Sequence, residues 1–339
     1  MKHKNIWFLV SLFLILILSG CQRNFYFTTD GERYTEDNMN YFGTVKEPVE
    51  EITAINVNTQ YADFEIIASD GYYVEYSYYY VDEEPVLTII DGTLTFNDSS
   101  MNQGGYSISL KKPNYFKLYV PAAADFNKAN ITVSSGNVSM GSFSAKEVKV
   151  ENSYGDTIVT TAAIDKLTTV TSSGRLTIER SAIGEADIKN YYGDIVIRSI
   201  NEKEDFATKE YPDASISFEL SSGSLEIEKL NAGELQFDNS YGGVRVEDSV
   251  ITSLKGKLSS GDVTVLDCKM EQIDIDNSYG KIDVMLIGKQ EDYCLDITSR
   301  YGDVWVERKK YDGSVLIDKG GTKRIELYLS SGNAKISFR

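Results

Sequence analysis

Histidine is nearly absent from this 339-residue sequence, which contains only one, His3. We expect His3 to be removed with an N-terminal segment, so histidine-based catalysis and histidine-ligated zinc are excluded from the mature chain. Cysteine is also rare, with three residues, and Cys21 is assigned below to lipid attachment. The other two, Cys268 and Cys294, are weak evidence for a disulfide. Their repeat positions point the two side chains in different directions, so we expect free thiols.

Sequence signatures of catalysis are missing as well. The chain contains no G-x-S-x-G, H-E-x-x-H or C-x-x-C motif and no dinucleotide-binding loop. We therefore predict a protein that is not an enzyme and that has no cofactor. Basic residues are outnumbered, since 51 acidic residues against 34 basic ones give a net charge of −17. Such a surface repels nucleic acid, and no nucleic-acid partner is expected.

The N-terminus has the layout of a secretory signal. Basic residues precede an apolar stretch, Ile6–Leu18, which is shorter than the roughly 20 residues that a spanning helix needs. Small residues then lead to a cysteine in Leu18-Ser19-Gly20-Cys21, which is similar to the lipobox of bacterial lipoproteins. We expect residues 1–20 to be a signal peptide and Cys21 to carry the lipid that anchors the chain outside the cytoplasm, on the outer face of the cell membrane. The alternative is an apolar helix followed by a free cysteine.

The dominant feature of the chain is an internal repeat marked by glycine. From residue 134 onward, short turns end in a glycine, and the glycine positions increase in steps of 19, 19, 19, 30, 19, 19, 19, 22 and 30. They are Gly136, Gly155, Gly174, Gly193, Gly223, Gly242, Gly261, Gly280, Gly302 and Gly332. Apolar and polar residues alternate on both sides, as strands require.

A repeat unit of this length, with two strands and a short polar return, fits one turn of a parallel β-solenoid. The sequence thus predicts an all-β fold of about ten such turns over residues 126–339. A β-sandwich or a propeller is the alternative. Residues 50–125 contain irregular strand patterns and predict an N-terminal β cap, and the polar residues 21–49 predict a tether.

The turns alternate between the forms S-S-G and N-S-Y-G. Strand parity places the residues three and one before each glycine on the inward face, as with Asn152 and Tyr154. We interpret the result as a packed corner in which tyrosines alternate with serines, and not as a ligand cleft. Aspartate directly follows the glycine in four turns, at Asp156, Asp194, Asp262 and Asp303. The paired glycines of calcium-binding β-rolls are missing, so ordinary turn chemistry explains these aspartates and no metal is expected.

Alternating S-S-G-D-V and N-S-Y-G-D-I turns resemble the "putative adhesin" domains of bacteria, a β-strand repeat family. The segment Phe116–Pro121 is similar to the strand that precedes the repeats in that family. The resemblance covers about residues 50–339 and departs from the pattern at Arg175, where aspartate is usual. It implies a right-handed parallel β-solenoid in the cell envelope, and it supplies no catalytic residues.

Two clusters are candidate ligand contacts. In the segment G-Y-Y-V-E-Y-S-Y-Y-Y-V, one strand face would hold the four tyrosines Tyr72, Tyr76, Tyr78 and Tyr80. Exposed tyrosines suit sugars, because the ring stacks and the hydroxyl forms hydrogen bonds; the alternative is that these rings fill the cap. The second cluster is Lys309 and Lys310, in a locally basic long return over residues 307–323.

These features favour a non-catalytic cell-surface lipoprotein: an adhesin, or a module that binds an envelope polymer or a protein, with envelope-stress sensing as a variant. Its expected partners are the membrane, through lipidated Cys21, and a cell-wall polymer, host glycan or protein. Two alternatives stay open. One is a polysaccharide lyase or hydrolase on a β-helix, which needs only carboxylates or basic residues on an outer face. The other is an architectural protein that forms oligomers through an open terminal strand, Ala334–Phe338.

Overall fold

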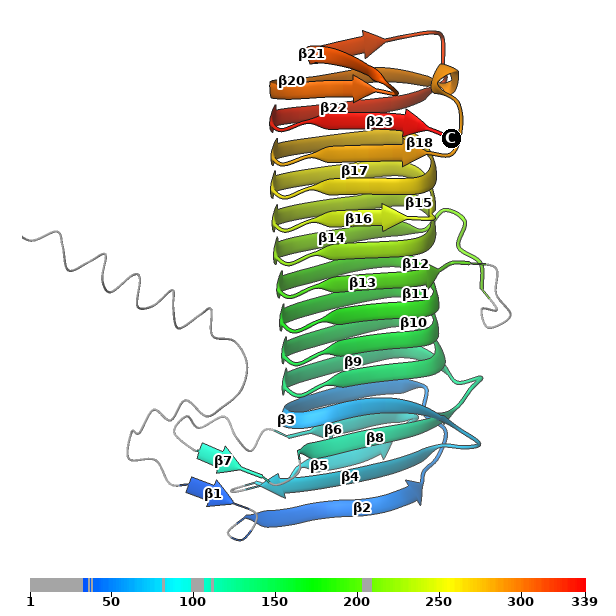
Figure 1. Ribbon diagram of the computed structural model, residues 1–339. Helices are drawn as coiled ribbons and strands as arrows, with labels where there is room; N and C mark the ends of the chain where they lie inside the picture. The colour runs from blue at the N-terminus through cyan, green and yellow to red at the C-terminus, as the bar shows by residue number, and fades with distance from the viewer. Residues whose placement is uncertain are drawn as a thin grey trace, which may run out of the picture.

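The computed structural model describes residues 33–35, 37, 39–80, 83–98, 107–110, 113–202 and 209–339. In these residues the strands stack turn upon turn into a rod (Figure 1). The all-β prediction and the predicted solenoid stacking are confirmed. The predicted signal peptide, residues 1–20, and the anchor Cys21 lie outside the described residues.

The strands of the N-terminal end are β1 (Arg33–Thr35), β2 (Asn40–Pro48), β3 (Ala54–Ser69), β4 (Tyr73–Tyr80), β5 (Val86–Ile90), β6 (Thr93–Asn97), β7 (Ser107–Ser109) and β8 (Asn114–Pro121). Those of the stack are β9 (Asp125–Ser135), β10 (Val138–Tyr154), β11 (Thr157–Ser173), β12 (Leu176–Tyr192), β13 (Ile195–Ile200), β14 (Ser215–Ser222), β15 (Leu225–Tyr241), β16 (Val244–Glu247), β17 (Val250–Ser260), β18 (Val263–Tyr279) and β19 (Ile282–Leu286). The C-terminal end holds the 3-10 helix η2 (Gln290–Asp292) and the strands β20 (Tyr293–Val306), β21 (Lys309–Ile317), β22 (Lys323–Ser331) and β23 (Ala334–Phe338).

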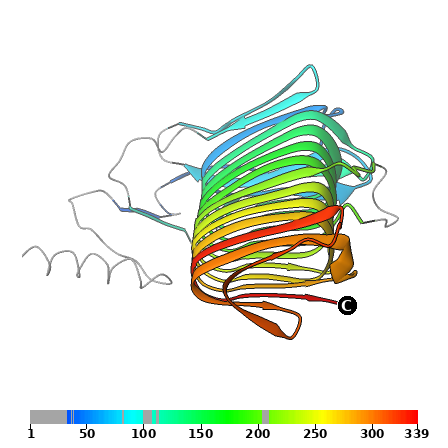
Figure 2. The same cartoon turned by 90° about the horizontal axis from the view of Figure 1, so that it is seen from above.

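Neighbouring turns pair in parallel. β10 pairs with β11 from Val138↔Thr157 to Tyr154↔Ser173, an offset that equals the commonest step between the corner glycines. The apolar residues on both sides of each glycine point inward and are buried in one continuous core. Figure 2 looks along the rod and shows the turns following the same outline. Burial of these side chains is the main stabilising contribution, at ~1.5–3 kcal/mol for each fully buried Val, Leu or Ile.

Each turn has a second corner that the sequence pattern did not reveal. After seven of the corner glycines, the residue six positions further on adopts positive φ, for example Ser142 (φ 58°), Thr161 (φ 55°) and Lys229 (φ 57°). The segment that follows carries buried side chains, for example Phe143 and Ala162. The predicted polar return is therefore wrong: this part of the turn is a third ladder that closes the core.

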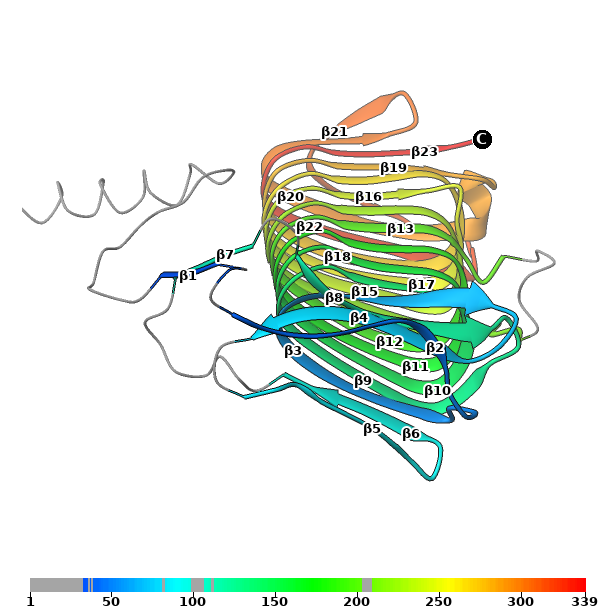
Figure 3. The ribbon, with the colours of Figure 1, turned by 90° about the horizontal axis from the view of Figure 1, so that it is seen from below.

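The parallel stack begins earlier than the predicted boundary at residue 126. β3 pairs in parallel with β9 and with the start of β10, so it forms two of the three ladders of a turn. β6 and β8 pair in parallel with β3 on its other side. Beyond them the pairing becomes antiparallel, with β5 on β6, β4 on β8 and β2 on β4. Figure 3 shows these strands across the N-terminal end of the rod.

The last turns do not stack in sequence order. β22 pairs with β18 on one side and with β20 on the other, and β23 pairs in the same way with β19 and β20. The final turn of the chain is thus inserted beneath the preceding one, and β21 lies antiparallel on β20 at the very end. The prediction that Ala334–Phe338 offers an open edge is wrong, because both edges of β23 are paired. Oligomer formation itself stays a prediction.

The two cysteines of the stack are free thiols. Cys268 is fully buried in the third ladder, and burial raises the pKa of its thiol to about 11. Cys294 is half-buried in β20.

Candidate functional site: a ridge of tyrosines

The tyrosines that the sequence put forward do not form an exposed platform. Tyr76 is 9% exposed and Tyr78 is 0% exposed, and both pack in the aromatic core of the N-terminal end. The Tyr76 ring lies 6.2 Å from that of Phe116 and the Tyr78 ring 5.1 Å from that of Phe96, between centroids. Tyr72 and Tyr80 are half-buried. As ligand contacts, Tyr76 and Tyr78 are wrong, because a strand with one face on the core buries every second side chain.

The opposite face of β4 carries a different aromatic group. Glu75 accepts hydrogen bonds from the hydroxyls of Tyr115 (3.1 Å) and Tyr119 (2.7 Å). The Lys46 ammonium lies 4.5 Å from the ring centroids of Tyr73 and of Tyr119. Burial and the hydrogen bond to Glu75 raise the pKa of Tyr119 to about 12. Each polar group here already has a partner within the sheet, so this face is a closed network.

Lys309 and Lys310 are the first two residues of β21, which forms a hairpin with β20. The Lys310 ammonium lies 2.7 Å from the Asp303 carboxylate, and the Lys309 ammonium lies 4.6 Å from the Tyr311 ring centroid. Lys309 also borders an open hollow of about 690 Å³ at the C-terminal end of the rod, together with Arg308 and Lys319. Exposed contacts of this kind contribute little binding energy individually.

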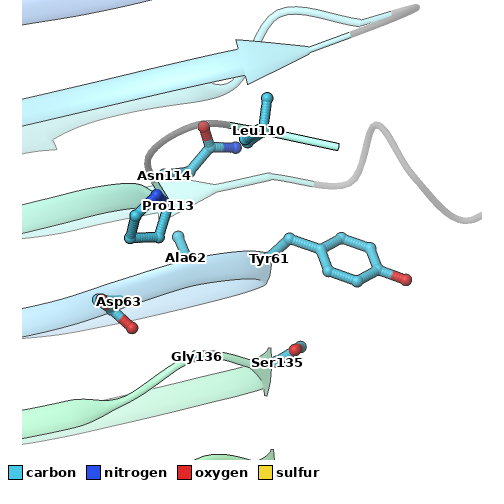
Figure 4. A pocket seen from close by; sticks show the side chains of 8 residues that line it. All are labelled: Tyr61, Ala62, Asp63, Leu110, Pro113, Asn114, Ser135 and Gly136. Atoms are coloured by element: carbon cyan, nitrogen blue, oxygen red, sulfur yellow. The ribbon is translucent and has the colours of Figure 1, made fainter. Parts of the chain in front are cut away.

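The most regular surface feature is the line of glycine corners, along the left edge of the rod in Figure 1. In alternate turns a tyrosine precedes the glycine, and these tyrosines point outward, so the predicted inward packing of their rings is wrong. Five of them, together with Tyr61, which holds the same position before Ala62, are between 49% and 74% exposed and are here called the tyrosine ridge. They are Tyr61, Tyr154, Tyr192, Tyr241, Tyr279 and Tyr301. Tyr61, the first of them, projects away from its strand in Figure 4.

Serines separate the ridge tyrosines in a strict alternation. Register pairs connect the whole line from Tyr61↔Ser135 to Tyr279↔Ser331, and the N–H of Gly332 donates to the carbonyl of Tyr301. In stacking order the column is Tyr61, Ser135, Tyr154, Ser173, Tyr192, Ser222, Tyr241, Ser260, Tyr279, Ser331 and Tyr301. Strands are about 4.8 Å apart, so neighbouring tyrosines are about 9.6 Å apart.

Glycine is required at the corner because the turns approach each other closely. At Gly242, with φ 131°, a Cβ would overlap the carbonyl oxygen of Gly223 in the turn below. The same relationship connects the corner glycines from one turn to the next, and only glycine combines this approach with positive φ at little cost. The corners therefore stack directly over one another and keep the ridge straight.

Inside the corner, four of the tyrosine turns carry an asparagine that donates to a glycine carbonyl of the neighbouring turn. The Asn239 amide donates to the carbonyl of Gly223 (3.1 Å) and to that of Gly242 (3.3 Å). Asn152 makes the equivalent pair of bonds to Gly136 and Gly155. Both asparagines are buried. This half of the strand-parity prediction holds: the residue three before the glycine points inward.

Outside the corner, the residue after the glycine forms a second column of bonds. Asp156 Oδ1 accepts the backbone N–H of Arg175 (2.8 Å), and Asp262 Oδ1 accepts that of Lys281 (2.8 Å). Asp194 accepts both the N–H and the hydroxyl of Ser224, which lowers the pKa of its carboxyl. Asp156, Asp194 and Asp262 thus hold successive turns together. The described residues contain no group of three or more potential metal ligands.

A cavity of about 460 Å³ opens at the N-terminal end of the tyrosine ridge (Figure 4). It is lined by Tyr61, Ala62, Asp63, Leu110, Pro113, Asn114, Ser135 and Gly136. The buried Asn114 amide bonds to the backbone N–H (2.9 Å) and the carbonyl (3.2 Å) of Tyr79, so its polar atoms are occupied.

Within the described ranges, no helix is long and apolar enough to cross a membrane.

Sequence reasoning missed the ridge because it extended strand parity through the corner. The run Asn152-Ser153-Tyr154-Gly155-Asp156 has one buried residue followed by four that are at least partly exposed. The local signal was available, since polar residues and glycine on both sides of the tyrosine mark a turn, where alternation with a period of two ends.

Comparison with known proteins places the chain in one family. The family model described as Toastrack DUF4097 matches residues 52–211 and 206–338. No curated protein matches the chain significantly.

Several solved structures resemble the rod at low sequence identity. One, described as a putative lipid binding protein from Parabacteroides distasonis, is 13% identical with a TM-score of 0.42, covering 90% of this chain and 99% of that one. Another, described as a putative adhesin from the same organism, is 12% identical with a TM-score of 0.33, covering 91% and 100%. A third, described as a putative adhesin from Parabacteroides merdae, is 15% identical with a TM-score of 0.29, covering 73% and 98%. At such TM-scores the likeness carries no argument about function.

Proposed function

The chain belongs to the Toastrack DUF4097 family, and we propose that it is a non-catalytic surface module that binds an extended polymer or protein outside the cytoplasm. The observation that carries this proposal is the tyrosine ridge, in which six exposed rings repeat at every second turn along the rod. Large exposed aromatic side chains supply contact area at low entropic cost, and soluble proteins seldom expose them in ordered rows without a partner.

The proposal includes the location expected from the N-terminal sequence. Cys21 would carry the lipid, and the rod would stand outside the membrane. The predicted tether of residues 21–49 is too long, because residues 40–48 form β2 and pair with β4, so only the residues between Cys21 and β2 would act as a tether. An adhesin and a module that reports on the state of the envelope are both forms of this function. Right-handed winding, a count of about ten turns and a capping role for the N-terminal strands belong to the same proposal, on the family resemblance.

A rigid rod is better suited to binding than to catalysis. The ridge is held by backbone hydrogen bonds, buried asparagines and aspartate bridges, so it is organised before any partner arrives. Its side chains are phenols and hydroxyls, and the neighbouring carboxylates of Asp156 and Asp262 accept backbone N–H groups of the next turn.

Co-sedimentation tests the proposal. The full chain would be mixed with purified cell-wall polymers and with host glycans and proteins, beside a variant carrying Tyr154→Ser, Tyr192→Ser and Tyr241→Ser. Serine already occupies this column in alternate turns, so the variant keeps the fold. Saturable binding that the variant loses supports the module. Binding that the variant retains, or sugar release by the wild type, would contradict it.

A further inference from the structure

We propose that the tyrosine ridge is the binding site of an uncharged, β-1,4-linked glycan that lies along the rod, with one disaccharide unit for every two turns. This inference rests on the proposed binding function and names the ligand class.

The spacing of the ridge is the first argument. Tyrosines are separated by one serine turn, which sets them about 9.6 Å apart. In an extended β-1,4-linked chain, successive sugars are rotated by about half a turn, so every second sugar presents the same face to the same side. The length of one such disaccharide is close to the spacing of the tyrosines. Each ring can therefore stack on an equivalent sugar face without bending the chain.

The serine turns supply the second argument. Between two ridge tyrosines, the rung holds Ser135, Ser173, Ser222, Ser260 or Ser331, each partly exposed. A serine hydroxyl both donates and accepts, which suits the hydroxyls of the intervening sugar. A tyrosine at this rung would instead place two rings about 4.8 Å apart and close the space for that sugar.

The negative charge beside the ridge favours uncharged polymers over anionic ones. The residues two positions after the tyrosines and serines of the ridge form a column beside it. This column contains five aspartates, Asp63, Asp156, Asp194, Asp262 and Asp303, against two basic residues, Arg175 and Lys281. The whole chain carries a net charge of −17. Anionic polymers such as polyphosphate chains or uronic acid chains are repelled from this surface, whereas an uncharged glycan is not.

The order of the last turns is the third structural argument. In the sequence, Tyr279 and Tyr301 belong to successive turns, so simple stacking would place their rings next to each other. Insertion of β22 and β23 puts Ser331 between them and continues the regular spacing to the end of the rod. The periodicity of the ridge is thus maintained where the sequence order would interrupt it.

Oligosaccharides of increasing length test the proposal. Chito-oligosaccharides and cello-oligosaccharides are uncharged and β-1,4-linked, and malto-oligosaccharides of equal length provide the α-1,4-linked control. Titration calorimetry with the full chain, kept in detergent, should show affinity that rises with each added disaccharide until six tyrosines are engaged, for one β-1,4-linked series at least. Malto-oligosaccharides should bind about tenfold or more weaker at every length.

Two variants distinguish the effect of the spacing between the ridge tyrosines from the effect of their number. The first replaces Tyr192 and Tyr241 with serine and should weaken binding of the longest oligosaccharide about tenfold or more. The second combines Tyr192→Ser with Ser222→Tyr, which keeps six tyrosines but moves one out of the regular spacing. It should weaken binding to a similar extent. Circular dichroism would check that both variants are folded.

The outcomes distinguish this inference from the proposed function. Equal binding of the β-1,4-linked and α-1,4-linked series, or full binding by the second variant, would overturn the inference. No oligosaccharide binding, together with tyrosine-dependent binding to another polymer or to a protein, would also overturn it and leave the proposed function standing. If the tyrosine variants keep both oligosaccharide binding and binding to the other polymer or protein, the inference and the proposed function are both wrong.

Discussion

Tyr279 and Ser331 are direct neighbours in the glycine corner, although the complete turn of Tyr301 lies between them in the sequence. The N–H of Gly280 donates to the Ser331 carbonyl at 3.1 Å, and the N–H of Gly332 donates to the Tyr301 carbonyl at 3.2 Å. The inserted turn therefore has both of its edges paired. Alternation of tyrosine turns and serine turns is a property of the three-dimensional stack and not of the sequence order alone.

Deleting turns should reveal this alternation as a stability effect. Removal of residues 224–261, two turns, places Ser222 beside Tyr279 and keeps the alternation. Removal of residues 243–261, one turn, places Tyr241 beside Tyr279 and stacks Asn239 on Asn277, so both asparagine amides compete for the same glycine carbonyl. We expect the shorter deletion to lower the Tm by about 2 °C or more below that of the longer one.

Thermal unfolding followed by circular dichroism measures the difference. The longer deletion removes more buried surface, so repeat number alone predicts the opposite order. A lower Tm for the two-turn deletion would show that neighbouring turns are interchangeable, and that alternation has no energetic role.

Two adjacent glycines provide a test of the corner. Gly242 has φ 131° and no space for a Cβ, whereas the nearest atom to a Cβ on Gly243 would be the Asp262 carbonyl oxygen at 3.5 Å. Gly242→Ala should lower the free energy of unfolding by about 3 kcal/mol or more, because it adds backbone strain to a steric overlap. Gly243→Ala should change it by about 0.5 kcal/mol or less. Urea unfolding of both variants checks the pair, and similar values would contradict the close stacking.

Asn239 offers a pH-dependent test of the buried column formed by the residues three positions before the corner glycines. Its Oδ1 atom is buried with no hydrogen-bond partner in the described part of the chain, and its amide faces two glycine carbonyls. In Asn239→Asp, burial and the carbonyls would raise the carboxyl pKa in the folded state above its unfolded value of about 3.9. The variant should lose about 3 kcal/mol or more of unfolding free energy at pH 7. This loss is complete above the folded-state pKa and shrinks as the pH falls towards about 4.

Asn239→Leu is the matched control, because Leu220 and Leu258 occupy the same column in the neighbouring turns. It removes the unpaired oxygen together with the amide, so we expect a change of about 1 kcal/mol that does not depend on pH. Urea unfolding at several pH values measures both variants. An aspartate variant whose deficit is constant with pH would show that the site is open to water.

Much of the rod can be predicted from residues that are close together in the sequence. Alternation around Val148 and Val150, or Val263 and Val265, identifies the strands and the side chains that they bury. The regular step between corner glycines gives the register, because each turn pairs with the next at that offset. The aspartates after the glycines were also explained as turn residues, and Asp156 bonds to the backbone of the next turn.

The candidate site was harder to predict because it depends on the corner. Parity correctly placed Asn152 inside but failed two residues later at Tyr154, where the chain bends and the ring turns outward. Parity also left open which face of β4 meets the core, and the structure buries Tyr76 and Tyr78 instead of exposing them. The positive φ at Ser142 and Thr161 had no sequence signal, since these residue types vary from turn to turn.

The sequence by itself determined the repeat, the strands, the buried columns and the need for glycine at each corner, because these depend on residues close together in the chain. Only the tertiary structure decided that the tyrosines line an outer ridge and that the turn of Ser331 lies between those of Tyr279 and Tyr301. Strand pairing and core burial are satisfied by more than one order of turns. The choice among those orders depends on contacts between residues that are far apart in the sequence.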